Sequence, residues 1–484
     1  MEGLDRRELL ARGGALALAA GLAGAVPEWA LAAGPTKQQL KQLARQIHGS
    51  VVTPGSHGYN RDRLLVNTRY DGVHPAAIVY CASAGDVQTA VKWARGHGIR
   101  IVPRSGRHSY GGYSTTPGVV VDVSRLGFVQ PHGHTAKIGA GAILIDIYTK
   151  LWSSGHRTIP GGSCPTVGIA GLAQGGGVGY TARKFGLTLD SIQSLSIVTA
   201  NGKKLVCSPS QHSDLFWAVR GGGGGNFGIV TSFLFKTHAV GNVSTFYISW
   251  PWSSAAHAVA AWQKLAPHAP GSLFSDLILS SGGSVSAQGQ FLGSPAALRR
   301  LLRPLANVHG ASVSVQQRTY MQAVMHWANC SSLAQCRVLP RETFKAKSDY
   351  LNQPMSHAGI QTMIRWVEKH QAGSVAVILD SYGGAIKKVP KSATAFVHRN
   401  ALYSIQYYEG WGGSNGPAAL RFIRDFYKAM RPYVSGYAYQ NYIDPDLTSW
   451  AHAYYGSNYP RLQHVKRKYD PHNVFRFAQS IRPA

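Results

Sequence analysis

Two side chains with nucleophilic atoms stand in glycine-rich stretches. His108 lies in PRSGRHSYGGYS, and Cys164 lies in GSCPTVGIAGLAQGGGVG. A loop rich in glycine and serine that follows a strand can point consecutive backbone N–H groups at a phosphate, and Arg104 and Arg107 add positive charge. The pattern therefore predicts a site for a cofactor that carries a diphosphate, and FAD suits it.

Each of the two residues also has a plain structural explanation. Taken alone, His108 is a turn histidine whose side chain bonds locally, and Cys164 is a thiol packed in the core. No periodic apolar face surrounds Cys164, because it stands between glycine-rich turns. Taken together, the two residues favour a ligand site.

Two other motifs fail for lack of the right neighbours. GGSNG matches the nucleophile elbow, but Pro417 is typical of a first helical position, so the helix begins three residues after Ser414, and we reject a serine hydrolase. GGGNFG satisfies the dinucleotide fingerprint, yet the strand-like IVTSFLFK follows it, which excludes an NAD site. Close approach of this glycine backbone to some other ligand stays open.

The strands and helices that must position these loops follow two different sequence patterns. Up to about residue 240, strand-like AAIVYC and IRIVPRSG enclose the helical AGDVQTAVKWARGHG, which is an α/β rhythm. From about residue 242, alternating segments such as VSTFYISWPW and SVAVILDSYGG are interleaved with amphipathic helices. We expect an antiparallel sheet backed by helices, and a final helix, turn and closing segment in RLQHVKRKYDPHNVFRFAQSI.

Composition limits the class of protein. A chain of 484 residues with 44% hydrophobic content is too long for one core, so two domains are expected. The 49 Lys and Arg against 21 Asp and Glu give a formal charge of +28, which attracts polyanions. The basic residues are scattered and form no nucleic-acid motif, so we expect no specific nucleic-acid binding.

The first residues are typical of an export signal. Arg6 and Arg7 precede an Ala/Gly/Leu stretch and the small-residue site ALAA, which is a twin-arginine pattern over residues 1–33. The alternative, a membrane anchor, is disfavoured because the apolar run is short and rich in glycine, and no later segment is long enough to span a membrane. Twin-arginine export carries folded proteins, which hints at a cofactor inserted before export.

Cysteine use agrees with an oxidising destination. Cys330 and Cys336 have a spacing that can close a small disulfide loop. Cys81 and Cys207 end apolar strand-like runs, so we expect both to be buried small hydrophobic residues.

Four segments, in this order, resemble one known family. PRSGRHSYGGYS, GSCPTVGIAGLAQGGGVGYTARKFGLTLDSI, RGGGGGNFGIVTSFLF and YYGSNYPRLQHVKRKYDPHNVFRFAQSI are similar to the berberine bridge enzyme family of the vanillyl-alcohol oxidase superfamily. The resemblance implies an α+β fold: an FAD-binding domain of two α/β subdomains, built from residues 36–240 and 436–484, and a substrate domain, residues 241–435. An antiparallel sheet covered by helices would roof the flavin.

The resemblance also implies roles for particular residues. His108 would be joined to the flavin 8α-methyl group and Cys164 to its C6, while Val167 matches a position where a small valine goes with oxygen reactivity. Tyr442 matches the catalytic base, and Asp380 matches its acidic partner in carbohydrate oxidases. The alternative for Asp380 is a strand-end acid that caps the turn at Gly383 and Gly384.

A wider set of residues is carried over from the same motifs, and one departs from the family. Arg107 stands where the family commonly has a glycine. The residues expected around FAD are Arg104, Ser105, Gly106, Arg107, His108, Ser109, Tyr110, Cys164, Val167, Gly168, Gly171, Gly175, Gly176, Gly177, Gly179, Ile229, Val230, Asn441, Tyr455, Asn458 and Tyr459. Tyr110 and Gln406 are expected to contact the substrate, and no metal is expected.

The resulting hypothesis is an exported, bicovalent FAD oxidase located outside the cell or on its wall. It would convert an alcohol or hemiacetal carbon of a mono- or oligosaccharide to a carbonyl or lactone, with reduction of O2 to H2O2. The alternative is an FAD-linked oxidoreductase that tailors a secondary metabolite such as a glycosylated polyketide. A non-catalytic, basic wall-binding protein is disfavoured because both tethers and the tyrosine are present. Non-specific adhesion to anionic wall polymers is expected from the charge.

Overall fold

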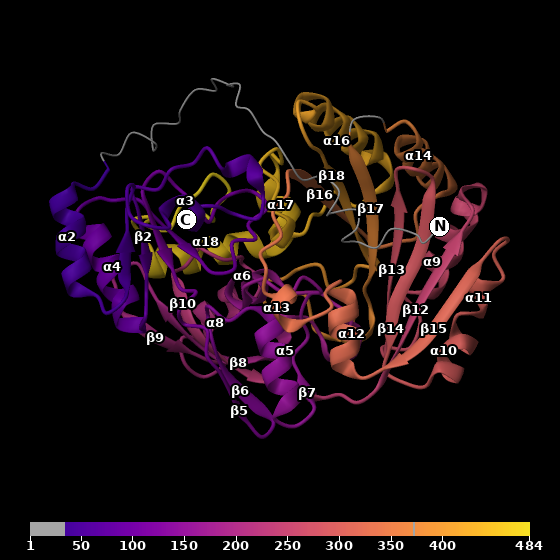
Figure 1. Cartoon of the computed structure of the whole chain (residues 1–484), viewed down its shortest axis with the longest axis horizontal. Coiled ribbons are helices and arrows are strands. Elements are labelled where there is room, and N and C mark those ends of the chain that lie inside the picture. Colours follow the sequence, from indigo (N-terminus) through magenta and orange to yellow (C-terminus); the bar gives the residue numbers. More distant parts are fainter. Residues whose placement is uncertain (1–33, 371–372) are drawn as a thin grey trace.

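The computed structural model describes residues 34–370 and 373–484 (Figure 1). The predicted twin-arginine signal, residues 1–33, lies outside the described residues. Within them, no helix combines the length and the apolar character needed to cross a membrane.

A small sheet near the N-terminus positions the histidine loop. Its strands, in the order β1-β2-β4-β3, are β1 (Ser50–Val52), β2 (Ala77–Tyr80), β4 (Val119–Asp122) and β3 (Ile101–Arg104). The predicted β–helix–β unit is confirmed: α4 (Ala84–Gly96) joins β2 to β3, and both strands run parallel to β4. Ser83 Oγ accepts the backbone N–H of Asp86, which starts this helix. Because β3 ends at Arg104, the following loop carries His108 away from the end of the sheet.

The second sheet of the N-terminal half is antiparallel. Its order is β5 (Val129–His132), β6 (Thr135–Gly139), β10 (Ile229–Lys236), β8 (Ile192–Val198) and β9 (Lys204–Cys207). The α/β rhythm expected over residues 36–240 therefore holds for the parallel strands β2, β4 and β3, and the later strands pair antiparallel instead. A buried strand has the same sequence period in both kinds of sheet, so the pattern alone does not show a neighbour's direction.

The alternating segments after residue 242 form an antiparallel sheet, as predicted, and this sheet has seven strands. Its order is β15 (Ser312–Arg318), β12 (Val243–Trp250), β14 (Ser284–Phe291), β13 (Leu273–Ser280), β17 (Ser374–Ser381), β18 (Tyr403–Gly410) and β16 (Phe344–Leu351). Three amphipathic helices cover its outer face (Figure 1): α9 (Ala255–Leu265), α14 (His357–Glu368) and α16 (Gly416–Met430). The inner face turns toward the N-terminal half.

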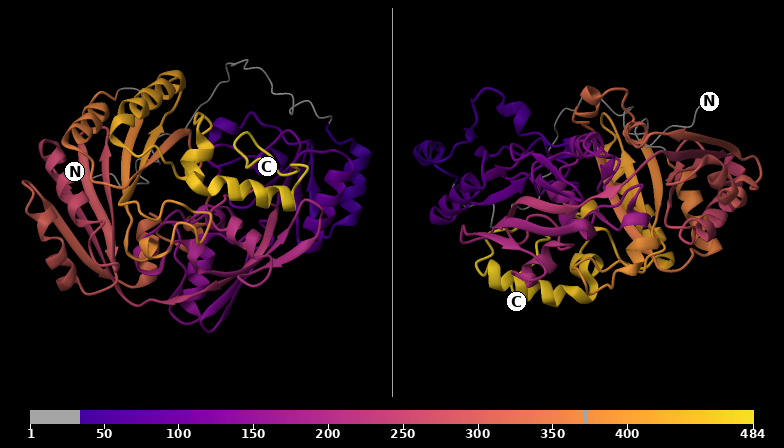
Figure 2. Two further views of the ribbon diagram at one scale, coloured as in Figure 1. Left: turned by 180° about the vertical axis from the view of Figure 1, so that it is seen from behind. Right: turned by 90° about the horizontal axis from the view of Figure 1, so that it is seen from below.

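The C-terminal segment returns to the N-terminal half. In Figure 2, left, the yellow helix α18 (Tyr459–Tyr469) lies along the purple and magenta elements. The buried Lys466 Nζ donates to the carbonyl oxygens of Asn226 and Phe475, at 2.6 Å each, and pairs with Asp470 at 2.7 Å. These contacts agree with an FAD-binding domain made from both chain ends, and the domain boundaries remain predictions.

Shorter elements complete the chain. The remaining strands are β7 (Arg157–Thr158) and β11 (His238–Ala239), which pair with each other. The remaining helices are α2 (Lys37–Gln46), α3 (Tyr59–Asp62), α5 (Leu144–Ser153), α6 (Ile169–Gly175), α7 (Ala182–Phe185), α8 (Ser213–Val219), α10 (Pro295–Leu301), α11 (Arg303–Ala306), α12 (Tyr320–Trp327), α13 (Leu333–Cys336), α15 (Gly384–Lys388) and α17 (Trp450–Tyr455).

Several local predictions can be checked directly. Cys330 and Cys336 form a disulfide, and Cys81 and Cys207 are buried, as expected. Helix α16 begins at Gly416, one residue earlier than Pro417 predicted, and Ser414 is exposed in the turn before it. Ser414 therefore does not start the helix, which agrees with the rejection of a serine hydrolase.

Candidate active site

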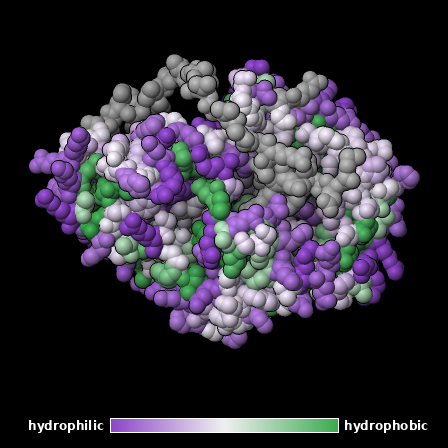
Figure 3. Space-filling model, viewed as in Figure 1, coloured by the Kyte–Doolittle hydropathy of each residue, from purple (hydrophilic) through white to green (hydrophobic). Residues whose placement is uncertain are grey.

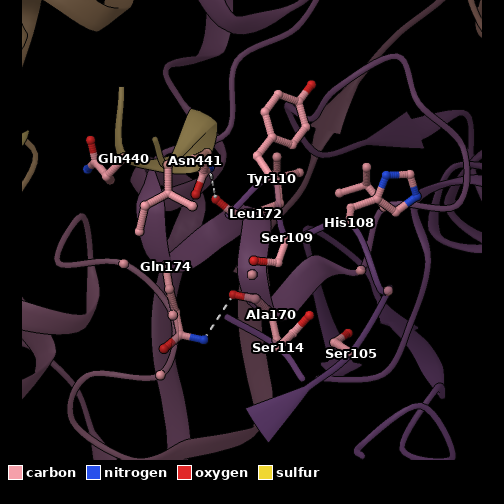
Figure 4. Close-up of a pocket in the computed structure, with 18 of the residues that line it drawn as sticks. Ser105, His108, Ser109, Tyr110, Ser114, Ala170, Leu172, Gln174, Gln440 and Asn441 are labelled. Carbon is pink, nitrogen blue, oxygen red and sulfur yellow. Dashed lines mark hydrogen bonds between the residues drawn. The ribbon is translucent and has the colours of Figure 1, made fainter. Parts of the chain in front are cut away.

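One cavity of about 280 Å³ lies where the histidine loop, α6, the glycine run at 223–225 and the C-terminal segment meet the inner face of the large sheet. Figure 4 shows His108 on one side and Gln440 and Asn441 on the other, with residues of α6 between them. The predicted site residues that line it are Arg104, Ser105, Gly106, Arg107, His108, Ser109, Tyr110, Cys164, Val167, Gly168, Gly171, Gly179, Ile229, Val230, Asp380, Asn441, Tyr442 and Tyr455.

The other predicted residues support this lining from behind. A Cβ at Gly175 would lie 1.9 Å from Asn441 Oδ1, so glycine lets Asn441 approach α6 and donate to Leu172 O at 3.0 Å. The Gly177 backbone N–H donates to Tyr439 Oη at 2.7 Å, and Gly176 lies beside the same tyrosine. Two of the other predicted residues contact residues of the lining directly: Gln406 donates to the Tyr110 hydroxyl, and the Tyr459 ring stacks on Tyr455. Asn458 donates to the carbonyl oxygen of Ala395.

The histidine and cysteine loops are pressed together by glycines. A Cβ on Gly106 would lie 2.1 Å from Gly168 N, so only glycine permits this approach. His108 Nε2 lies 2.8 Å from Thr166 Oγ1, and Thr166 is two residues from Cys164. Because His108 and Cys164 are both half-buried and face one cavity, the fold brings together the two residues that the sequence singled out.

Tyr442 lies under the inner face of the large sheet. It ends the short 3₁₀ turn η6 (Gln440–Tyr442), and its ring stacks on Tyr110 with centroids 5.2 Å apart. Gln406 Nε2, from β18, donates to Tyr110 Oη at 3.2 Å. The predicted base and the two predicted substrate residues therefore form one connected group.

Asp380 contributes a carboxylate to the same roof. It is 2% exposed on β17 and accepts a hydrogen bond from Ser404 Oγ at 3.2 Å. That partner lies on the neighbouring strand β18, so within the described residues the hydrogen bond does not belong to a cap on the turn at Gly383. Burial, with a further contribution from Asp380, raises the pKa of the nearby Tyr439 above its usual range.

Comparison with known proteins agrees with this geometry. The family model for an FAD binding domain matches residues 75–208, and the model described as berberine and berberine like matches residues 438–482. A chitooligosaccharide oxidase of Gibberella zeae is 31% identical, covering 93% of this chain and 96% of its own. The solved structure of Physcomitrella patens BBE-like 1 superposes with a TM-score of 0.88 at 36% identity, covering 91% of this chain and 98% of its own. The chain belongs to the berberine bridge enzyme-like family.

A third relative is known in two forms that differ in their reaction. Two variant structures of Phl p 4, a grass pollen allergen, are each 30% identical and cover 93% of this chain and all of their own, with TM-scores of 0.85 and 0.84. One variant is described as a glucose dehydrogenase, and a second, with an added isoleucine-to-valine substitution, is described as a glucose oxidase. Among its relatives, then, this family includes oxidoreductases that act on carbohydrates.

The residues present fit FAD, the cofactor of this family. Arg104 is 2% exposed, and its Nε donates to Asp122 at 2.6 Å, while Nη1 and Nη2 have no hydrogen-bond partner among residues 34–370 and 373–484. The charge of Arg104 is therefore paired with that of Asp122, and its side chain is 0% exposed, so it ties β3 to β4 beside the cavity and does not itself require an anion. The Ser114 hydroxyl on the same wall is also buried without a partner in the described part of the chain.

The glycine run that failed as an NAD motif faces this cavity. Gly223 and Gly225 have φ of +83° and +78°, in the left-handed region that favours glycine. A Cβ on Gly224 would meet no heavy atom closer than 3.8 Å, so the backbone there borders open space. The close approach of backbone to ligand that the sequence left open is thus available to FAD.

The backbone at Arg107 is of a kind that favours glycine. Its φ is +64°, a conformation that costs a non-glycine residue on the order of 1 kcal/mol, which agrees with the glycine that the family resemblance implies at this position. The Arg107 side chain donates to Tyr80 Oη at 3.2 Å, and its carbonyl accepts the Val66 N–H at 3.0 Å. The substitution is accommodated, and His108 keeps its place.

Several residues of the cavity wall were not predicted from the sequence. They are Tyr113, Ser114, Gln174, Tyr180, Asn226, Asp276, Arg476 and Phe477. All of them except Asp276 lie inside the four segments that carry the family resemblance, but no role was assigned to these positions. Asp276 lies outside those segments, and its signal is local, because LFSDLILS places an acid inside an apolar strand. No group of three His, Cys, Asp or Glu in the described ranges could hold a metal ion.

Proposed function

We propose that this FAD-dependent oxidoreductase is a bicovalent carbohydrate oxidase that forms hydrogen peroxide. The observation that carries the proposal is the shared cavity: the paired loops of His108 and Cys164 lie below it, and Tyr442 and Asp380 stand at its roof. This is the arrangement expected for removing a hydrogen from an alcohol or hemiacetal carbon, with the hydroxyl proton going to a base.

The protein residues divide the work between holding and proton transfer. The glycine run at 223–225 and the loop that follows β3 hold the diphosphate, and His108 and Cys164 are the two covalent attachment points. Tyr442 takes the proton from the substrate hydroxyl, while Tyr110 and Gln406 orient that hydroxyl. FAD, when bound, would supply the acceptor for the hydride from the substrate carbon and the route by which two electrons reach dioxygen.

The covalent attachment is tested by acid precipitation of the purified holoenzyme. We expect the yellow flavin to stay with the polypeptide in the wild type and in each single variant, His108→Ala and Cys164→Ala. Only the double variant should release FAD into the supernatant. Release from the wild type would contradict both tethers, and release from one single variant would leave the other residue without a link.

Val167 supports oxygen as the acceptor. It lines the cavity three residues after Cys164, at the position where the family resemblance associates a small valine with oxygen reactivity. The isoleucine-to-valine change that accompanies a glucose oxidase description in Phl p 4 supports the same reading. We expect Val167→Ile to keep anaerobic flavin reduction and to slow reoxidation by O2, with Val178→Ile, also on the wall, as the control.

The substrate class is tested by a peroxide-coupled screen. Mono- and oligosaccharides are compared with simple alcohols and with glycosylated aromatic compounds at equal concentrations. Peroxide formed mainly from sugars would support the carbohydrate oxidase. Peroxide formed only from glycosylated aromatic compounds would instead support the secondary-metabolite reaction.

The charge and the N-terminal pattern support export to an anionic surface. The face in Figure 3 is largely hydrophilic, with apolar residues in small groups, and the formal charge of the chain is +28. We expect the enzyme to bind anionic wall polymer and to elute as salt rises, because exposed charges are screened within about 8 Å at physiological ionic strength. Retention at high salt would point to a specific site instead.

A further inference from the structure

The cavity roof holds a second carboxylate that the proposed reaction does not use. Asp276 on β13 is the register partner of Asp380 on β17, so both side chains lie on the inner face. They are 1% and 2% exposed, and both line the cavity. Opposed residues of an antiparallel pair have Cα atoms about 4.5–5.5 Å apart, so two of the 21 acids of a basic chain share one small region.

Asp276 is held by a tyrosine from the opposite side of the cavity. Tyr180, between α6 and α7, donates from its hydroxyl to Asp276 Oδ2 at 3.0 Å and accepts from Gln288 Nε2 at 3.2 Å. Gln288 lies on β14, directly opposite Asp276. The chain of donors runs from amide to phenol to carboxylate, so it orients Asp276 as a hydrogen-bond acceptor.

An aromatic pair fixes the position of that tyrosine. The Tyr180 ring stacks on Trp327, with centroids 4.2 Å apart, and the Trp327 indole donates to Gln290 Oε1 at 3.1 Å. On the other side of the roof, Gln406 and Tyr110 make a similar amide–phenol contact beside Tyr442. The cavity therefore has two tyrosine-bridged walls, and only one of them carries the predicted base.

The charges around the cavity are separated by element. The arginines of its wall are Arg107, in the loop after β3, and Arg476, in the C-terminal segment, while Arg104 at the end of β3 is paired with the buried Asp122. The roof contributes Asp276 and Asp380. Because buried charges are poorly screened, a carboxylate brought to the roof would be repelled, whereas a hydroxyl or an ammonium group could donate to it.

We infer that Asp276, oriented by Tyr180 and Gln288, is a specificity residue that binds a hydroxyl or ammonium group of the sugar and excludes sugars that carry a carboxylate. The inference rests on the proposed carbohydrate oxidase function and narrows its substrate class to neutral and amino sugars. The basic surface attracts polyanions, and the acidic roof rejects them as substrates. An anionic polymer would then be bound on the outside without being oxidised.

The experiment compares three sugars that share one ring. D-Glucose, D-glucosamine and D-glucuronate are titrated into the oxidised holoenzyme and followed by the flavin difference spectrum, and each is then tested for anaerobic flavin reduction. We expect the wild type to bind glucose and glucosamine at least about 10-fold more tightly than glucuronate. Asp276→Asn should weaken glucose binding about 10- to 100-fold, the range for a hydrogen bond to a charged group, and should narrow the preference over glucuronate.

Two further variants serve as a control and as a second test of the role of Asp276. Asp425→Asn removes one carboxylate from an exposed position on α16 and should leave all three affinities unchanged. Tyr180→Phe keeps the ring and removes only the donor to Asp276, so it should shift the same preference by a smaller factor, and it carries the test if Asp276→Asn does not fold.

The outcomes separate this inference from the proposed function. An unchanged preference for glucose over glucuronate in both roof variants overturns the inference, even if glucose reduces the flavin. Binding in the expected order without flavin reduction supports the inference and contradicts the proposed oxidation of these sugars. No spectral change with any sugar overturns both.

Discussion

The two faces of the seven-stranded sheet are built from the same strands and differ in composition. On the outer face, Leu277, Leu379 and Ile405 are fully buried under α9, α14 and α16. On the inner face, the neighbouring positions Asp276 and Asp380 meet the cavity. Because side chains alternate along a strand, one sequence of residues supplies an apolar core and a polar roof.

The two faces contribute differently to the stability of the fold. Burying the apolar outer face is favourable by roughly 25 cal/mol per Å² removed from water. Burying carboxylates and amides on the inner face is unfavourable unless each finds a hydrogen-bond partner. The inner face therefore depends on groups from across the cavity, such as Tyr180 and Tyr110, whereas the outer face depends on packing alone.

The largest expected effect is on the rate of flavin reduction, at Tyr442, the proposed catalytic base below the inner face. Tyr442→Phe should slow anaerobic flavin reduction by roughly 10² to 10⁴, the usual size of a general-base contribution, because the substrate hydroxyl loses its proton acceptor. Covalent flavin and thermal stability should be retained. Stopped-flow reduction measures the rate, and a near-normal rate would remove Tyr442 from the mechanism.

A substitution in the apolar outer face should lower the stability of the fold and leave the reaction unchanged. Leu277→Ala should lower the free energy of unfolding by about 2–5 kcal/mol, because it leaves a cavity under α9 and α14. The rate of flavin reduction per folded molecule should stay unchanged. Denaturant titration with flavin kinetics checks both, and Val313→Ala, 42% exposed on the edge strand β15, is the matched control.

A smaller effect on the rate of flavin reduction is expected at Asp380, the proposed acidic partner of Tyr442. Asp380→Asn keeps the shape and the acceptor oxygen for Ser404 but removes the negative charge that can take a proton from the tyrosine. We expect flavin reduction to fall by less than in Tyr442→Phe, and the alkaline-rising limb of the pH profile to move. A pH profile that does not move would contradict a role for Asp380 in the proton transfer from Tyr442.

A buried histidine, His398, should make the stability of the fold depend on pH. Burial lowers the pKa of His398, which stacks on Tyr350 at 4.3 Å and lies 3.0 Å from Tyr454 O, to about 3. The unfolded histidine has a pKa of about 6.5, so the unfolded state binds more protons between these values. Stability should be unaffected above pH 6.5 and should fall below it, by up to about 1.4 kcal/mol per pH unit.

Two histidine variants isolate this contribution. His398→Asn should flatten the fall of the unfolding free energy between pH 6.5 and 4, and His357→Asn, at an exposed position on α14, should leave the slope as in the wild type. Equal slopes in the two variants would show that the acid sensitivity arises at other groups.

Much of the architecture was open to prediction because its signals are local. The unit β2–α4–β3 and the antiparallel sheet with its helices follow from periodicity and capping, and the spacing of Cys330 and Cys336 allowed the disulfide that the structure shows. The antiparallel second sheet was missed because strand direction depends on partners that are distant in the sequence.

The candidate site was predictable where a motif carries its chemistry and not elsewhere. His108 and Cys164 stand in segments that carry the family resemblance, Tyr442 stands in the family match over residues 438–482, and all three line the cavity. Tyr180 also stands in one of those segments, but its importance, like that of Gln288, comes from contacts with Asp276 that are made by strand register and by a loop across the cavity.

The sequence by itself determined the chemical types: which residues can be alkylated, which can take a proton, and how basic the whole chain is. Those properties belong to side chains and their immediate neighbours, so they can be read without a fold. Only the tertiary structure decided which of them meet. Glycines that let two loops touch, and a register that sets Asp276 opposite Asp380, act between residues that lie far apart in the chain, because packing and strand pairing join them.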